Sequence, residues 1–248
     1  MDKEKKLIDG LRGIIPSLHT PFCNQNKIDI PSLKNLIDHT ISTGCSGMLV
    51  GAVAGENSSL SFEEKMMIID ECSSYNKNRI PIIISCSAKN QKDRVALAKS
   101  AKEAGADWIL CQTPENVSGS ELLQCFNEIA EAGPHNLMIQ DLSWTDNGMS
   151  DEDIMLLFEN INKFRALKIE VLNSGPKYSR ILEATNHQLH LSGGWAIMGM
   201  IEALNRGVHA FIPSTMEIIY NKIYKLFTEN KIEASRQLFY QILPILSF

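Results

Sequence analysis

The 248-residue sequence has no run of 18 apolar residues and no basic cluster beyond Lys3 to Lys6. The missing apolar run argues against a membrane-spanning helix, and the charged start of the chain does not have the apolar core of a signal peptide. With a formal net charge of −5, the sequence also gives no field for capturing a polyanion. We therefore expect a cytoplasmic protein that binds neither membrane nor nucleic acid.

Short paired spacings are absent among the six cysteines, which are Cys23, Cys45, Cys72, Cys86, Cys111 and Cys125. Disulfide frameworks and zinc sites usually place their cysteines at short, regular intervals. We therefore expect reduced thiols, mostly as small core residues, with no metal and no other cofactor.

What the sequence does contain is an alternation of short apolar runs with longer helical patterns, repeated eight times. The expected strands are residues 13–18, 47–52, 81–85, 108–112, 137–141, 166–170, 190–192 and 210–213. Each run is short and mostly apolar, as a strand covered on both faces must be. This alternation predicts an α/β protein with a parallel sheet.

Local signals support the helices between these strands. In residues 61–75 apolar side chains recur every three or four positions, and Ser61 precedes Glu64 by the interval of a capping box. Glycines that follow helical runs predict left-handed C-caps. These are Gly44, Gly105, Gly133 and Gly207.

The choice between a closed barrel and an open, doubly wound sheet depends on the first turn. An open sheet often carries a glycine-rich phosphate turn after its first strand, whereas this turn reads His19-Thr20-Pro21-Phe22. We therefore predict a (β/α)8 TIM barrel over residues 1–225, followed by a short C-terminal helical extension, 226–248. Residues 217–248 are expected to form one long or bent helical region.

The strongest chemical signal is Lys168 on the sixth expected strand. A two-residue period directs Leu167 and Ile169 toward the helices and Lys168 toward the lumen. Burial there disfavours the ammonium form and favours an amine that can attack a ketone carbon. The structural alternatives are an ion pair with Glu170 or Glu56, or a strand register shifted by one residue.

Five segments together carry a resemblance to a known family. They are Ile14-Ile15-Pro16-Ser17-Leu18-His19-Thr20-Pro21-Phe22, Gly55-Glu56, Thr113-Pro114, Lys168 and Leu191-Ser192-Gly193. In this order and spacing the sequence resembles the dihydrodipicolinate synthase and N-acetylneuraminate lyase family. The resemblance implies a class I mechanism, in which Lys168 condenses with pyruvate or another 2-oxo acid.

The sequence also departs from that family's pattern. Ala52-Val53-Ala54-Gly55-Glu56 replaces Gly-Thr-Thr-Gly-Glu, so two hydroxyl groups are missing. Gln140-Asp141 replaces the Tyr-Asn that ends the fifth strand, and with it the usual acid/base phenol. Glu115 and Asn116 replace a second tyrosine, and no arginine stands near Trp144 and Thr145 to hold a second carboxylate.

By this comparison, the expected catalytic residues are Lys168, Gln140, Glu56 and Asp141. The expected substrate-binding residues are Val53, Ala54, Gly55, Asn116, Gly193 and Ile212. An amide exchanges no useful proton near neutral pH, so another group must replace the phenol. The titratable candidates at the strand ends are His19, Glu56, Asp141 and Glu170.

The sequence therefore predicts a Schiff-base lyase, aldolase or dehydratase, and not dihydrodipicolinate synthase itself. One alternative is a catalytically impaired barrel retained as a 2-oxo-acid-binding or regulatory protein. Another is a barrel that binds a divalent metal through Asp141, Glu170 and Glu56. A lysine on the following helix, Lys177, is expected to serve as an unreactive control.

The apolar C-terminus indicates assembly. Its apolar side chains should seek cover on the barrel or on another subunit. They are Phe239, Ile242, Leu243, Ile245, Leu246 and Phe248. We expect a homo-oligomer, a dimer or tetramer, with an extension shorter than the C-terminal helical domain typical of the family.

Overall fold

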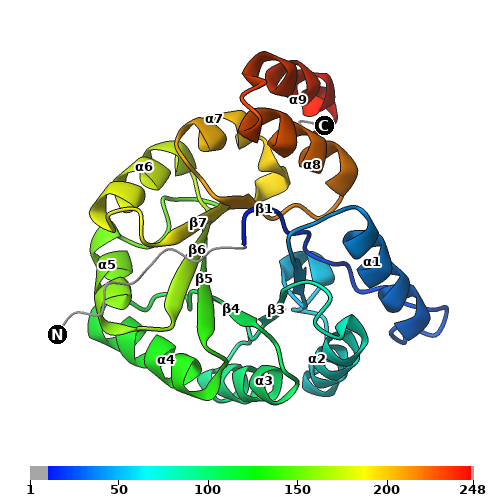
Figure 1. Cartoon of the computed structure of the whole chain (residues 1–248). Coiled ribbons are helices and arrows are strands. Elements are labelled where there is room, and N and C mark those ends of the chain that lie inside the picture. Colours follow the sequence, from blue (N-terminus) through cyan, green and yellow to red (C-terminus); the bar gives the residue numbers. More distant parts are fainter. Residues whose placement is uncertain (1–10, 247–248) are drawn as a thin grey trace.

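A computed structural model describes residues 11–246 and shows eight parallel strands surrounded by helices (Figure 1). The strands are β1 (Gly13–Ile14), β2 (Met48–Val50), β3 (Ile82–Ser85), β4 (Trp108–Gln112), β5 (Asn136–Leu142), β6 (Phe164–Glu170), β7 (His190–Gly193) and β8 (Ala210–Phe211). The helices are α1 (Ile30–Ser42), α2 (Phe62–Asn76), α3 (Gln91–Glu103), α4 (Gly119–Ala132), α5 (Asp151–Asn160), α6 (Ser174–Ala184), α7 (Met200–Asn205), α8 (Glu217–Thr228) and α9 (Ile232–Leu246). The 3-10 turns η1 (Val53–Gly55) and η2 (Trp195–Ile197) follow β2 and β7. The (β/α)8 barrel predicted from the sequence is confirmed.

The barrel closes between β1 and β2. The strand order runs from β1 through β8 and back along the chain to β2. At the remaining seam, the Leu49 N–H donates to the Pro16 carbonyl at 2.9 Å, and the Leu18 N–H donates to the Leu49 carbonyl at 2.8 Å. Regular pairing of β1 is shorter than the predicted 13–18 because Pro16 has no N–H to contribute to a ladder. These two bonds leave no free sheet edge at the seam.

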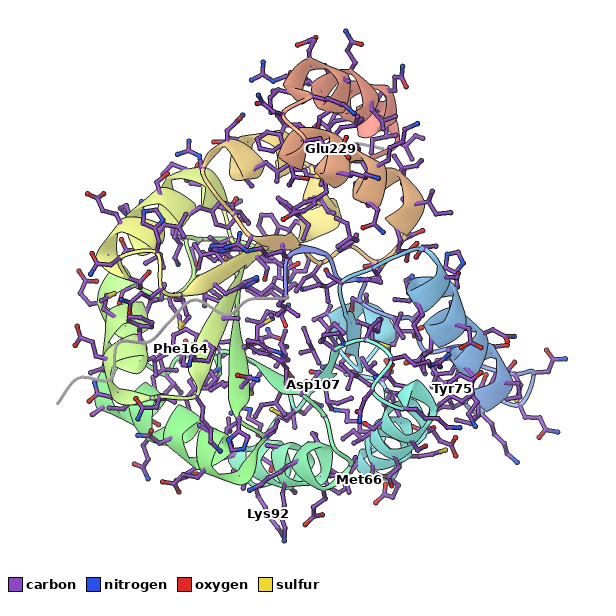
Figure 2. All side chains as sticks on the ribbon, viewed as in Figure 1. Met66, Tyr75, Lys92, Asp107, Phe164 and Glu229 are labelled. Carbon is purple, nitrogen blue, oxygen red and sulfur yellow. The ribbon has the colours of Figure 1, made fainter. Side chains whose placement is uncertain are left out.

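Alternate strand residues face two separate cores. Met138 and Ala166 belong to the cluster inside the barrel, whereas Leu167 and Ile169 belong to the cluster between strands and helices. Figure 2 shows Phe164, at the start of β6, between the strands and the outer helices. The expected alternation along β6 is therefore present, and it directs Lys168 into the lumen with Ala166.

The helix ends follow the predicted signals with one exception. Ser61 and Glu64 form the capping box of α2. Gly44, Gly105 and Gly207 have positive φ values of 74°, 79° and 89°. The prediction for Gly133 is wrong, because it is extended with φ −81° and ψ −179°. Its missing side chain instead lets the end of α4 approach β4, where an added Cβ would collide with Ile109.

The C-terminal region forms two helices and not one. Helix α8 ends at Thr228, beyond the expected boundary at residue 225, and α9 lies outside the ring against α8 (Figure 1). Phe239 and Ile242 of α9 are buried, and Ser235 donates to the Ile223 carbonyl at 2.9 Å. Phe248 lies outside the described residues.

All six cysteines are free, as expected. Over residues 11–246 no helix has both the length and the apolar character that crossing a membrane requires.

Candidate active site

Three lumen positions on neighbouring strands lie at one level of the barrel. In the strand register, Gln140 on β5 is the Cα partner of Lys168 on β6, and Lys168 is the partner of Ser192 on β7. The side chain of Lys168 is only 6% exposed. These positions are at the carboxyl ends of the strands, the end of a (β/α)8 barrel where reactive groups gather.

Glu170, two residues after Lys168, connects Lys168 to Gln140. Its Oε2 lies 2.7 Å from Lys168 Nζ and accepts a 2.6 Å hydrogen bond from Gln140 Nε2. Its Oε1 accepts a 3.0 Å bond from the Trp195 N–H. Burial acts to raise the pKa of Glu170, but the Lys168 charge and the three hydrogen bonds outweigh it and lower the pKa below its ordinary value. Glu170 is therefore ionised near neutral pH.

The loop after β7 is shaped around this carboxylate. A Cβ added at Gly194 would collide with the Glu170 carboxyl group. The next residue, Trp195, stacks on Trp144 of the loop after β5, with ring centroids 5.5 Å apart and planes 15° from parallel. Trp144 is 68% exposed. The Trp195 backbone thus joins Glu170 to an aromatic pair that brings together the loops after β5 and β7.

Asp141 lies on the opposite face of β5 from Gln140. Its Oδ2 is 2.6 Å from Lys177 Nζ on α6, and its Oδ1 accepts from the Met149 N–H at 2.8 Å. Burial raises the pKa of Asp141 above its ordinary value, against the opposing pull of the Lys177 charge. The structure therefore brings Asp141 to Lys177 and not to Lys168. Lys177 itself is buried, so it is not the neutral control that the sequence suggested.

The small-residue loop after β2 is held by the loop after β1. Thr20 donates to the Gly55 carbonyl at 2.7 Å, and His19 Nδ1 lies 3.1 Å from the Ala54 carbonyl oxygen. The N–H groups of Gly55 and Glu56 donate within the loop. Val53 and Glu56 are exposed, and no contact joins either to Lys168 among the described interactions.

The other expected substrate-binding residues lie at or after the ends of β4, β7 and β8. Gly193 ends β7 and Ile212 directly follows β8; both are buried, and the Ile212 N–H donates a 2.8 Å bond to the Gly193 carbonyl. Asn116 is exposed on the loop after β4 and adopts a left-handed conformation with φ 57°. Of the expected catalytic set, the structure joins Lys168 to Gln140 through Glu170, while Glu56 and Asp141 stand apart.

Two hydroxyl groups in the lumen, those of Ser192 and Ser17, were not predicted from the sequence as part of the site. Ser192 and Ser17 are 0% and 4% exposed, and neither Oγ has a hydrogen-bond partner among the described residues. A buried hydroxyl without a partner is costly and is commonly completed by a ligand or water. The two-residue alternation along β7, applied to His190 and Ser192, would have placed Ser192 in the lumen.

A hollow of about 470 Å³ opens on the opposite face, between β1, the end of α1 and α8. Its lining includes Arg12, Lys222 and Lys225, all of which are exposed. It is remote from the strand ends that carry Lys168. Within the described part of the chain, no three His, Cys, Asp or Glu residues are grouped to hold a metal ion.

A closed (β/α)8 barrel with a buried lysine on the inner face of its sixth strand agrees with the architecture predicted from the sequence. The chain belongs to the dihydrodipicolinate synthetase family, whose model matches residues 10–247.

Named relatives show which activities occur among similar proteins. The 4-hydroxy-tetrahydrodipicolinate synthase of Neisseria gonorrhoeae is 29% identical over 188 residues, which cover 71% of this chain and 65% of that protein. The matched part of the chain thus spans about two thirds of that relative's length.

Solved structures share the fold. A sialic acid aldolase of Ruminococcus gnavus, solved as a catalytic lysine mutant, has a TM-score of 0.90 at 18% identity and covers 98% of this chain and 81% of that one. A prophage protein of the dihydrodipicolinic acid synthase family from E. coli K12, solved in complex with pyruvate, has a TM-score of 0.87 at 20% identity, covering 94% and 81%.

Proposed function

We propose that this chain is a class I lyase or aldolase that forms a Schiff base between Lys168 and pyruvate or another 2-oxo acid. The observation that carries the proposal is the buried amine of Lys168, directed into the lumen at the carboxyl end of β6. Membership of a family whose named relatives include synthases and aldolases supports it. Pyruvate is proposed first because a similar fold was solved with pyruvate bound.

The chemistry follows from the amine. A neutral lysine amine attacks the ketone carbon and, after loss of water, leaves an iminium that withdraws electrons from the adjacent carbon. That electron sink serves aldol addition, aldol cleavage or dehydration. In this proposal Gln140 orients the carboxylate of Glu170. Substrate contacts come from Val53, Ala54, Gly55, Asn116, Gly193 and Ile212.

The replaced residues support a reaction other than that of dihydrodipicolinate synthase. Val53 and Ala54 stand where the family has hydroxyl groups, and neither can donate a side-chain hydrogen bond. The amide of Gln140 cannot transfer protons as the phenol of the family's tyrosine does. The loop that holds Trp144 offers an aromatic surface in place of an arginine.

Reductive trapping tests the proposal. The protein incubated with pyruvate and borohydride should gain one stable adduct on the peptide that contains Lys168, and Lys168→Ala should abolish it. The matched control is Lys92→Ala on α3, because Lys92 is exposed and extends outward from the ring of helices (Figure 2). Labelling that persists in Lys168→Ala, or no adduct with pyruvate or longer 2-oxo acids, would refute the proposal.

A second function, ligand binding without turnover, is favoured by one observation. Lys168 is engaged in a 2.7 Å ion pair with Glu170, and a lysine in its charged form is not a nucleophile. Binding of a 2-oxo acid would then change the fluorescence of the Trp144–Trp195 pair without any trapped adduct. A trapped adduct at Lys168 decides against this second function.

A further inference from the structure

The family's acid/base tyrosine is absent, so some other group must move protons at Lys168. The sequence offered His19, Glu56, Asp141 and Glu170. His19 and Glu56 are exposed on loops, and Asp141 is paired with Lys177 behind β5. Among the described interactions, Glu170 alone of these four contacts the amine.

A buried tyrosine nearby does not fill the role. Tyr178 on α6 donates to the Ile169 carbonyl at 3.3 Å. It belongs to the cluster between strands and helices, on the other side of β6 from Lys168. Burial raises the pKa of Tyr178, so its phenol stays protonated. The phenol of Tyr178 is therefore separated from the reacting amine by the strand itself.

We infer that Glu170 is the proton-transfer residue of the Lys168 site, and that Gln140 is its positioning residue. Glu170 Oε2 is 2.7 Å from Lys168 Nζ, within the reach required of a general acid or base. Gln140 Nε2 fixes that same oxygen from the neighbouring strand at 2.6 Å, and the Trp195 N–H fixes the other oxygen. This inference rests on the proposed function.

Glu170 can complete imine formation without gaining or losing charge overall. It first takes one proton from the Lys168 ammonium, which frees the nitrogen lone pair to attack the ketone carbon and form the C–N bond. The carbonyl π electrons move to oxygen, and the protonated Glu170 returns its proton to that alkoxide. Glu170 then takes a second proton from nitrogen and gives it to the hydroxyl, which departs as water while the C=N bond forms.

The balance of this sequence is an ammonium and a ketone converted into an iminium and water. Glu170 begins and ends as a carboxylate. The carboxylate of a 2-oxo acid entering beside Glu170 adds a second negative charge, which favours transient protonation of Glu170. The iminium product keeps its positive charge next to Glu170, so the carboxylate also stabilises the intermediate.

The variant Glu170→Gln separates proton transfer from simple ion pairing, because the two roles predict opposite signs. If Glu170 transfers protons, trapping with pyruvate at pH 7 should slow by roughly 100-fold, in the usual range for a lost general acid or base. If Glu170 only stabilises the ammonium of Lys168, its neutralisation should leave trapping as fast or faster. The surface variant Glu103→Gln on α3 is the matched control for charge and should trap at the wild-type rate.

Chemical rescue supplies a measurement that would not change if Glu170 had only a structural role. Added formate should restore a large part of the trapping rate of Glu170→Ala but should leave Lys168→Ala unlabelled. Thermal melting of each variant checks that it is folded. Trapping in Glu170→Gln at or above the wild-type rate, or a folded Glu170→Ala that formate does not rescue, overturns the assignment of Glu170. Absence of labelling in the wild-type protein instead overturns the proposed function.

Discussion

Lys177 Nζ lies 2.6 Å from Asp141 Oδ2 between β5 and α6, and both side chains are almost fully buried. The same ammonium donates to the carbonyls of Asn147 and Met149 at 2.6 Å each. This contact ties α6 to β5 and to the end of the loop that carries Trp144. The Lys177–Asp141 ion pair therefore stabilises the loop after β5, beside the site, but does not contact Lys168.

Replacing Lys177 should destabilise the fold. Lys177→Met leaves the Asp141 carboxylate buried without its partner, which typically costs about 3–5 kcal/mol. Urea unfolding should show this loss. The double variant Lys177→Met, Asp141→Leu should recover much of the loss, since both charges are then removed. An unchanged unfolding midpoint for Lys177→Met would contradict the importance of the pair.

Ser192 should show opposite effects on stability and on ligand binding. Its hydroxyl has no partner among the described residues, so Ser192→Ala removes a buried polar group and should leave stability equal or raise it by about 1 kcal/mol. The same change should weaken 2-oxo-acid binding several-fold if the hydroxyl meets the substrate beside Lys168. Thermal melting and ligand titration measure the two effects. Loss of stability would indicate an existing partner for the hydroxyl.

The buried histidine pair at the base of the lumen should make stability depend on pH. His190 stacks on His209 with centroids 4.9 Å apart, and its Nε2 is 2.6 Å from the Leu11 carbonyl oxygen. Burial, aided by the charge of His209, lowers the pKa of His190 to about 3, and burial lowers the pKa of His209 to about 4. A histidine in the unfolded chain has a pKa of about 6.5. The stability that comes from burying both histidines in their neutral form is therefore fully present only above that pH. It is lost as pH falls toward the folded values.

For His190 alone the loss at pH 5 relative to pH 8 should be about 2 kcal/mol. Urea unfolding at the two pH values measures it. His190→Phe should reduce the difference between them by about that amount. The exposed His135→Gln is the control and should leave the difference unchanged. An equal pH dependence in wild type and His190→Phe would rule out this explanation.

Helices α8 and α9 should mediate self-association. Phe239 and Ile242 are covered by the chain itself, but Ile218, Tyr240 and Ile245 are 63%, 59% and 67% exposed. We expect a homo-oligomer, most simply a dimer, whose sedimentation shifts toward monomer in Tyr240→Glu or Ile245→Glu. A wild-type monomer over a broad concentration range would contradict this prediction.

The barrel could be predicted from the sequence because its signals are local and repeated. The capping box of Ser61 and Glu64 and the alternation around Lys168 each follow from a few neighbouring residues. Gly133 was mispredicted because its reason is tertiary: a strand residue, Ile109, lies where its side chain would be. Sequence periodicity does not report such close approaches.

The site was only partly predictable. Gln140 and Asp141 were both expected at the site, yet consecutive strand residues face opposite sides, so they could not both line the lumen. Applied strictly, the same rule selects Glu170 together with Lys168. The Trp195 N–H could not be foreseen, because a backbone donor has no residue-type signature. It depends on the fold of the loop after β7.

The absence of a side chain at Gly194 leaves the space that the carboxyl group of Glu170 fills. A side chain at 194 would displace the carboxylate of Glu170, so an acidic residue two positions after the lysine requires glycine at the second position after Ser192. Any enlargement of residue 194 would therefore act on the Lys168 site indirectly, through the carboxylate that contacts the amine.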